Sequence, residues 1–298
     1  LLELVKRHNK DFKKRIGIDR SESTYEKYAI TEMRLKSFLK KELKQKDLPL
    51  KSMKTIFLKD FTLYLQRVFS NKQNTVAKHV KNLKHIMTYG IELEWLNKNP
   101  FTGFKYSYIE TPQVILTEAE LYLIENTPLA SLRLERIKQM FLFQCYTGLA
   151  FIDMKSLTRK NIVLGNDGKK WISFTRTKSK IPVRVPLLEK AKVIIDRYKT
   201  NSDYLLPVTG LQNVNMLLKE IAIICGVDKN ISTHVGRRTF ATTVCLSNGL
   251  PIETVSKLLG HTNITITQVY AKKVDSVISE EMQTLEEVLR KKTNQKSV

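Results

Sequence analysis

Apolar residues recur at helical spacing through the first third of the chain, and this pattern predicts a small helical domain over residues 1–110. Ser21 or Ser23 can cap the second helix, which leads to a lysine-rich loop at 40–51. The predicted helices run from Leu2 to Ile16, from Ser21 or Ser23 to Phe38, from about Leu58 to Phe69, and onward from near Asn74. The expected apolar side of the second helix consists of Tyr25, Tyr28, Ile30, Met33, Leu35 and Phe38, and that of the fourth of Val76, Val80, Leu83 and Met87.

A change of pattern between Asn99 and Leu116 marks the boundary to a second domain, expected over residues 111–298. This stretch has turn formers, two prolines and little periodicity, as an exposed linker would. Helices are then predicted from Leu116, at 131–146, 188–198, 213–225 and, as a C-terminal amphipathic helix, at 274–291. Short strands are predicted at 162–164, 171–175 and 182–185, the last of them an edge strand because of Pro182 and Pro186. The predicted fold class is mainly α, with a mixed α+β second domain that carries a small antiparallel sheet.

The stretch from Ser232 to Tyr270 combines residue types that suggest a reaction centre. Ser232 or Thr233 is a natural N-cap, so His234 and Arg237 are expected three residues apart on one face of a helix. That helix would offer an imidazole and a fixed cation to the same small volume.

Two more residues belong to this group. Gly249 and Gly260 are expected to end two successive helices, His261 follows the second stop directly, and Tyr270 lies nine residues later. A phenol has a pKa of ~10, so Tyr270 needs cations or a base to act as a nucleophile. Arg237 could also hold two oxygens of a phosphate as charge develops on them, and the set therefore suggests phosphoryl transfer on a nucleic-acid backbone.

Other interpretations exist for the same residues. A His-x-x-Arg pair is often a capped surface pair, and the two helices around Gly249 resemble a helix-turn-helix that would only bind DNA. A zinc site made of His234, Cys245 and His261 lacks a fourth ligand at a usual spacing, so no metal site is predicted.

The charge of the chain points to a polyanionic partner. Lysine and arginine number 51 against 29 acidic residues, for a net charge of +22 over 298 residues. A basic ribosomal or membrane-surface protein could have the same charge, but no membrane span or leader is evident, and a cytoplasmic, nucleoid-associated protein is expected. The three cysteines, Cys145, Cys225 and Cys245, are widely spaced in apolar surroundings and are expected to be buried and reduced.

A basic helix face in the first domain is the best candidate for DNA contact. No acidic residue occurs between Asp60 and Glu92, and the apolar side of the fourth helix leaves Lys78, Lys81 and Lys84 to face outward. A solvated lysine face is the alternative.

The motifs together resemble the tyrosine recombinases, the phage-type integrases. The resemblance rests on His234 and Arg237, on Leu259-Gly260-His261, on Tyr270, and on Thr147-Gly148-Leu149 followed by Asp153. It implies a helical core-binding domain and a catalytic domain, with Tyr270 as nucleophile, Asp153 as supporting residue, and Lys178 as general acid, with Lys180 as the second candidate. It implies that Tyr270 attacks a phosphodiester, leaving a 3′-phosphotyrosyl link and a free 5′ hydroxyl, without ATP, metal or other cofactor. The implied partners are double-stranded DNA, accessory DNA-bending proteins, and other protomers in a tetrameric synapse that exchange the C-terminal helix.

The chain departs from the family at one position. The first catalytic arginine usually follows Thr-Gly-Leu, and here that residue is Ala150, as in a divergent subgroup of integrases from mobile elements. The candidates to replace it are Arg136, then Lys138, then Arg176.

Two other function classes remain open, a type IB topoisomerase and a catalytically inactive DNA-binding relative. The chain begins at Leu1 without a methionine, which leaves room for an additional N-terminal arm-binding domain.

Overall fold

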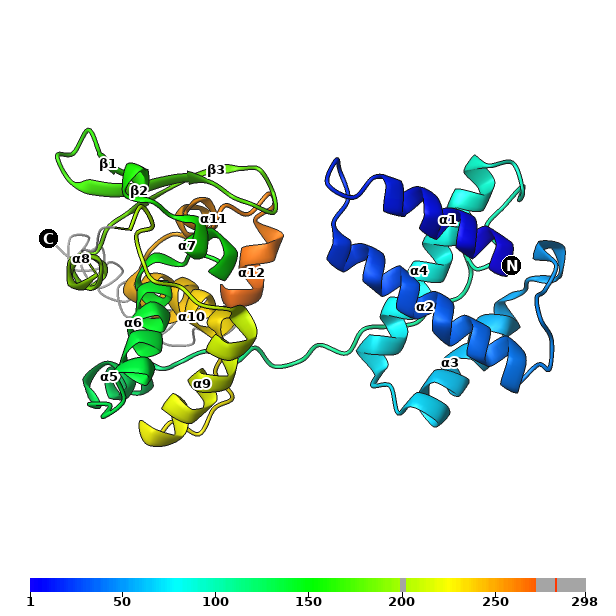
Figure 1. The fold of residues 1–298 in the computed structure, drawn as a ribbon, viewed down its shortest axis with the longest axis horizontal. Helices are drawn as coiled ribbons and strands as arrows, with labels where there is room; N and C mark the ends of the chain where they lie inside the picture. Colours follow the sequence, from blue (N-terminus) through cyan, green and yellow to red (C-terminus); the bar gives the residue numbers. More distant parts are fainter. Residues whose placement is uncertain (199–201, 272–281, 283–298) are drawn as a thin grey trace, which may run out of the picture. The chain divides into compact units, whose positions relative to one another are not determined.

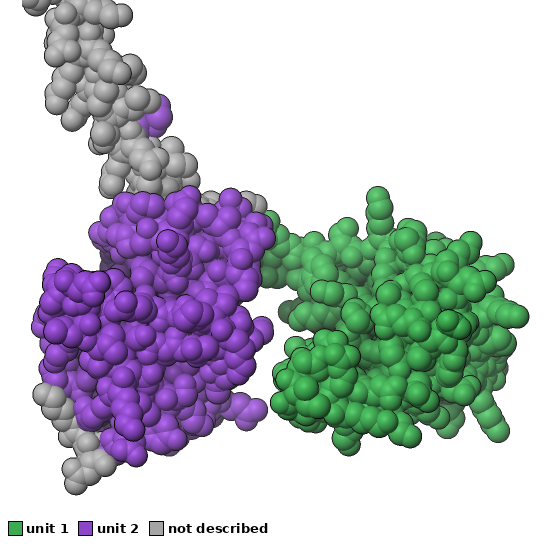
Figure 2. Space-filling view, turned by 90° about the horizontal axis from the view of Figure 1, so that it is seen from above, with its two compact units in different colours: residues 1–112 green, residues 113–298 purple. Residues whose placement is uncertain are grey.

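The computed structural model describes residues 1–198, 202–271 and 282, and the chain divides into two units, Leu1–Pro112 and Gln113–Val298 (Figures 1 and 2). Each unit has a hydrophobic core of its own. Within the described ranges, no helix is long and apolar enough to cross a membrane. The predicted fold class is confirmed, because the units are mostly helical and the second carries a three-stranded antiparallel sheet.

Unit 1 is built from helices whose aromatic side chains meet in its core. The helices are α1 (Leu2–Lys14), α2 (Glu22–Lys41), α3 (Thr55–Phe69) and α4 (Gln73–Glu92), with a 3₁₀ turn at Leu50–Ser52. Phe38 of α2 contacts Phe57, Phe61 and Tyr64 of α3 with ring centroids 5.2–5.4 Å apart. Such tilted and edge-on ring pairs add stability beyond the area that they bury.

The apolar sides predicted for α4 and α2 differ in their outcome. The four apolar residues named for α4 are all buried, as predicted. On α2, the prediction was wrong for Ile30 and Met33, which are 41% and 59% exposed. The buried stripe of α2 passes through Tyr28, Leu35 and Phe38 at helical spacing, and this leaves Ile30 and Met33 on another side.

Unit 2 is organised around α6 (Leu132–Thr147), which is buried on all sides from Ile137 onward. Antiparallel strands β1 (Ile162–Leu164), β2 (Lys170–Thr175) and β3 (Pro182–Pro186) form one sheet in that order, so β3 is an edge strand as its prolines predicted. The other helices of this part are α5 (Glu118–Asn126), α7 (Phe151–Ser156), α8 (Glu189–Arg197) and α9 (Leu211–Ile224). Figure 1 shows the sheet along one edge of the unit and α6 beside α10 in its interior.

The helix predicted between Ser232 and Gly249 is present in unit 2, but it has an irregular geometry that the sequence did not predict. Helix α10 (Thr233–Thr239) continues into a π-helix (Phe240–Cys245) and a 3₁₀ turn (Leu246–Asn248), and the stretch ends at Gly249 in the left-handed conformation. Helices α11 (Ile252–Leu259) and α12 (Thr265–Ala271) follow, with Gly260 as the left-handed stop of α11. The helix predicted at 274–291 lies outside the described residues, apart from residue 282.

The three cysteines are free and buried, as the sequence predicted. Burial raises the pKa of the Cys245 thiol to about 12 and raises the pKa values of Cys145 and Cys225 as well. All three are therefore protonated at neutral pH.

Because the cores are separate, damage to one unit should leave the other folded. We expect Phe38→Ala to lower the unfolding free energy of unit 1 by about 3–5 kcal/mol, the usual cost of an aromatic-sized cavity. Hydrogen–deuterium exchange resolved by peptide would show faster exchange in α2 and α3 and parental exchange in α6. Faster exchange in both units would mean that they unfold as one.

Candidate active site

Helix α10 carries His234 and Arg237, of which Arg237 is buried and His234 is exposed. Ser232 occupies the N-cap position in an extended conformation, but its side chain makes no capping bond. The amide of Thr233 instead donates to Asn215 Oδ1 of α9 at 2.9 Å. Helix α10 is therefore fixed by a neighbouring helix, a contact that the local sequence could not reveal.

Arg237 is 4% exposed and is held by the ends of two other helices. Its Nη1 donates to the carbonyl of Gly148 at 2.6 Å, and its Nη2 donates to the carbonyl of Leu259 at 2.6 Å. Gly148 ends α6 and Leu259 is the last residue of α11, so both acceptors lie at the negative ends of helix dipoles. The burial of Arg237 excludes the interpretation of the two residues as a capped surface pair, although His234 itself is exposed.

His261 contacts the same guanidinium. Arg237 Nη2 lies 3.3 Å from His261 Nε2, while His261 Nδ1 lies 2.8 Å from Thr267 Oγ1. Because a guanidinium can only donate, Nε2 is the acceptor, and Nδ1 carries the proton and donates to Thr267. His261 therefore orients Arg237.

Arg176 lies at the end of β2 and is the second cation of the site. Its Nη1 donates to the carbonyl of Gly260 at 2.8 Å, and its Nε lies 3.5 Å from Asp153 Oδ2. Asp153 is 1% exposed, and its Oδ1 accepts a hydrogen bond from the amide of Thr177 at 2.8 Å. One carboxylate thus holds both Arg176 and the turn between β2 and β3.

Burial and neighbouring cations lower the pKa values of three groups in the site. Burial, and then the nearby Arg176, lower the pKa of Arg237 to about 10, so Arg237 stays charged at neutral pH. Burial and the cations Arg237 and Arg176 lower the pKa of His261 to about 4. Partial desolvation of its ring, followed by the cations Arg238, Arg237 and Lys178, lowers the pKa of His234 to about 4, although the residue is exposed. Both imidazoles are therefore neutral at pH 7, surrounded by positive charge.

Tyr270 of α12 lies beside this cluster. It is 7% exposed and packs with Phe240, Val255 and Leu259, and its ring centroid lies 6.3 Å from that of His261. Arg237 and Tyr270 are close enough to influence each other electrostatically. The structure therefore brings together all four residues predicted from the segment 232–270.

A pocket of about 520 Å³ opens next to His234 and Arg237, and Ala150 forms part of its wall. Phe151, Ile152, Lys155, Leu211 and Asn215 also line it. Lys178, in the turn after β2, is exposed and lies within electrostatic reach of His234. Lys180 is in the same turn, with a left-handed backbone at φ +57°.

Arg136 and Lys138, the candidates preferred from the sequence to replace the arginine expected at position 150, do not contact Arg237. Arg136 is exposed in the second turn of α6, within electrostatic reach of Tyr198. Lys138 is buried, donates to the carbonyl of Thr127 at 2.8 Å and pairs with Glu135 at 2.9 Å. Arg176, ranked third from the sequence, is the one next to Arg237. The residues that tie it there, Asp153 and Gly260, are distant in sequence, so only the fold reveals the contact.

The three lysines proposed for DNA contact in unit 1 are not equivalent. Lys78 and Lys81 of α4 are exposed as expected. Lys84 is half-buried, and its ammonium donates to the carbonyl of Phe104, so the expectation that it faces outward was wrong. Its charge is used to hold the segment after α4 against the helix.

Among the residues that the structure describes, no group of three or more His, Cys, Asp or Glu side chains is placed to hold a metal ion. His234, Cys245 and His261 in particular do not form such a group.

Comparisons with known proteins cover nearly the whole chain. Residues 1–108 match the family described as phage integrase SAM-like domain, and residues 115–276 match the phage integrase family. A tyrosine recombinase of Pseudothermotoga lettingae is 25% identical over 245 residues, which cover 78% of this chain and 82% of that protein. Tyrosine recombinase XerD of Caulobacter vibrioides is 30% identical over 138 residues, 44% of this chain and 45% of that protein.

Solved structures show the same fold. A lambda integrase dimer bound to a COC′ core site superposes with a TM-score of 0.74 at 14% identity, covering 91% of this chain and 94% of that one. The Tn1549 transposon integrase in complex with circular intermediate DNA gives a TM-score of 0.69 at 17% identity, with 90% and 94% covered.

The double role of Asp153 can be separated by substitution. Asp153→Asn keeps an oxygen for the Thr177 amide but leaves the half-buried Arg176 without its counter-charge. We expect the unfolding free energy of unit 2 to fall by about 3 kcal/mol, the lower end for a buried pair that loses one partner. Chemical denaturation would measure the loss, and hydrogen exchange should increase at residues 175–181.

Asp167→Asn is the matched control, because Asp167 lies in the β1–β2 turn of the same sheet and is solvent-exposed. Equal effects of the two substitutions would contradict a special role for Asp153.

Proposed function

The chain belongs to the phage integrase family, and from this premise we propose that it is a site-specific DNA recombinase that uses Tyr270 as its nucleophile. The phenolic oxygen attacks a phosphodiester, forming a bond to phosphorus while the bond to the 5′ oxygen breaks. The products are a 3′-phosphotyrosyl link and a free 5′ hydroxyl, and attack by another 5′ hydroxyl reverses the step. The link conserves the energy of the broken bond, so the reaction requires neither ATP nor a metal ion.

The observation that supports this proposal best is the excess of positive charge around Tyr270. Arg237 and Arg176 lie close enough that Arg176 lowers the pKa of Arg237, and Asp153 is the carboxylate that pairs with one of them. An anion placed between the guanidinium groups would relieve their repulsion. The transition state of phosphoryl transfer carries its charge on the oxygens that two such groups can reach.

Each remaining residue has a role that follows from its contacts. Arg237 and Arg176 bind the non-bridging oxygens, with Arg176 in the place that Ala150 leaves without a cation. His261 holds Arg237, and Asp153 positions Arg176 together with the turn that carries Lys178. Lys178 gives a proton to the leaving 5′ oxygen. His234, neutral at pH 7, is available to accept the phenolic proton of Tyr270.

The partners follow from the reaction. Unit 1 is the core-binding domain and contacts duplex DNA through Lys78 and Lys81, and unit 2 is the catalytic domain. Related solved structures include a lambda integrase tetramer bound to a Holliday junction and a transposon integrase bound to DNA. By analogy this chain works as several protomers on DNA, at the nucleoid, in the movement of a mobile element, with accessory DNA-bending proteins.

Loss of the phenolic oxygen should remove the covalent intermediate and nothing else. We expect Tyr270→Phe to bind labelled duplex DNA like the parent but to form no protein–DNA adduct in EDTA without ATP. A denaturing gel measures the adduct and a mobility shift measures the binding. An adduct in the variant would place the nucleophile elsewhere, while an adduct in the parent without strand exchange or site preference would favour a topoisomerase. Binding by the parent without any adduct would indicate an inactive relative.

The contribution of Arg176 can be tested against Arg136. We expect Arg176→Ala to slow cleavage of a nicked suicide substrate by about 10²–10³-fold, the usual effect of losing a transition-state donor. Arg136→Ala, which removes an exposed arginine from the same unit, should cleave at the parental rate. Parental cleavage by Arg176→Ala would exclude Arg176 as the replacement, and a slow Arg136→Ala would restore the ranking from sequence.

A further inference from the structure

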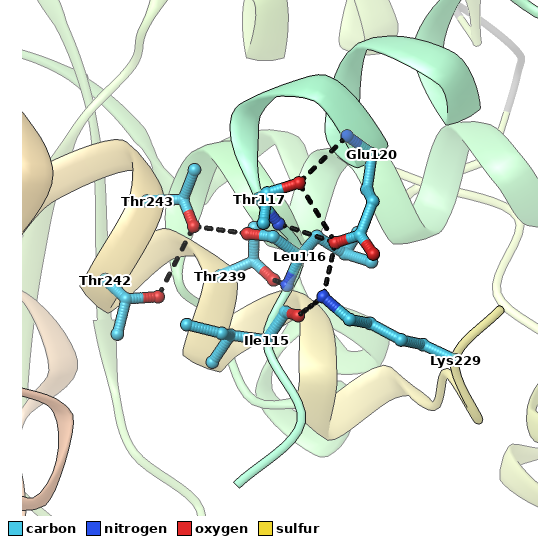
Figure 3. A network of polar contacts seen from close by, with 8 residues as sticks. All are labelled: Ile115, Leu116, Thr117, Glu120, Lys229, Thr239, Thr242 and Thr243. Carbon is cyan, nitrogen blue, oxygen red and sulfur yellow. Dashed lines mark hydrogen bonds and ion pairs between the residues drawn. The ribbon is translucent and has the colours of Figure 1, made fainter. Parts of the chain in front are cut away.

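The segment that enters unit 2 is bonded directly to the helix that carries the candidate catalytic residues (Figure 3). Leu116 is fully buried, its amide donates to Thr239 Oγ1 at 3.1 Å, and its carbonyl accepts from Thr243 Oγ1. Thr239 is the last residue of α10, and Thr243 lies in the π-helix that continues it. Two threonine hydroxyls thus give Leu116 the backbone pairing that a neighbouring strand would otherwise provide.

The side chain of Thr243 has a different partner from that of its neighbour. Threonine in a helix commonly donates to the carbonyl four residues earlier, and Thr242 does so to Arg238 at 2.8 Å. Thr243 donates to Leu116 instead, and its own carbonyl accepts from Asn248 Nδ2 at 3.0 Å. The π-helix is therefore held by groups outside it, which suits a rare geometry that is weak on its own.

The π-helix in turn supports an acceptor of Arg237. Phe240, its first residue, packs so closely on Gly148 that a Cβ there would lie 2.3 Å from Phe240 Cδ1. The carbonyl of Gly148 receives Arg237 Nη1. A continuous set of contacts therefore runs from Leu116 through the threonines and Phe240 to Gly148 and Arg237.

The segment is held a second time, one residue earlier. Lys229 donates to the carbonyl of Ile115 at 3.0 Å and also pairs with Glu120, which closes a capping box with Thr117 at the start of α5 (Figure 3). On the side of unit 1, Asn74 pairs with both the amide and the carbonyl of Ile109. Residues 110–114 lie between the two attachments.

We propose that Thr239 and Thr243 are positioning residues that set Arg237 by holding Leu116 against the π-helix. The position of the guanidinium that binds the phosphate then depends on the two hydrogen bonds of Leu116. The rate of strand cleavage depends on the same two hydrogen bonds. This inference rests on the proposed recombinase function for its effect on rate, but the contacts themselves can be tested without it.

The first measurement is independent of activity. We expect Thr239→Val and Thr243→Val, which keep the shape and remove the hydroxyl, to increase hydrogen–deuterium exchange in a peptide covering residues 144–150. Thr242→Val is the matched control, because Thr242 is equally buried and its hydroxyl donates to Arg238, with a longer contact of 3.5 Å to Thr243 Oγ1. Parental exchange in both test variants, or an equal increase in all three, would overturn the proposal.

The second measurement is single-turnover cleavage at saturating DNA. We expect the double valine variant to cleave about tenfold or more slowly with parental DNA affinity, since small misplacements of catalytic groups have effects of this size. Thr239→Ser with Thr243→Ser should restore the rate. In an Arg237→Lys background we expect the valine substitutions to cause no further loss of cleavage rate. A further loss that adds to the loss from Arg237→Lys would show an independent structural effect and would overturn the proposal.

The two assays also separate this proposal from the function on which it rests. If the parent forms no tyrosine-linked adduct, the proposed function fails, and the exchange measurement alone still decides whether the threonines hold Gly148. If the parent cleaves and the double valine variant matches it, the function stands and the positioning role is wrong.

Discussion

Two guanidinium groups held by carbonyl oxygens at helix ends are the interaction on which the second unit depends. Burying an arginine is costly unless its donors are satisfied, and here the acceptors come from Gly148, Leu259 and Gly260. All three lie where a helix stops and its last carbonyls have no partner of their own. The positions of α6, α11 and β2 are therefore linked, because each must deliver a backbone or side-chain group to the same small volume.

Glycine at two of these stops is a steric requirement. Gly148 and Gly260 have φ values of +68° and +60°, in the left-handed region. At Gly260 a Cβ would lie 2.4 Å from Val183 and 2.7 Å from the Arg176 stem. The space that a side chain at residue 260 would need is thus occupied by the stem of Arg176, whose guanidinium donates to the Gly260 carbonyl.

Much of the site was predictable because its signals are local. The helix stops at Gly249 and Gly260 and the His-x-x-Arg spacing are properties of a few neighbouring residues, and the structure places them as expected. The sequence ranks Arg176 below Arg136 and gives no sign of the contacts of Arg176 to Asp153 and Gly260, which span 23 and 84 residues. The π-helix was missed for the same reason, since its support comes from Leu116. The prediction that Lys84 faces outward was wrong because its ammonium donates a hydrogen bond to a backbone carbonyl twenty residues away.

The buried cysteines affect how this protein can be studied. The thiolate is the nucleophile that reacts with thiol reagents, and Cys145, Cys225 and Cys245 combine burial with raised pKa values. Maleimide dyes and spin labels should therefore leave the native protein essentially unmodified at neutral pH. A single cysteine introduced on the surface would be the preferred labelling site in an otherwise unaltered chain, so distances within either unit could be followed by fluorescence without first replacing the three native residues.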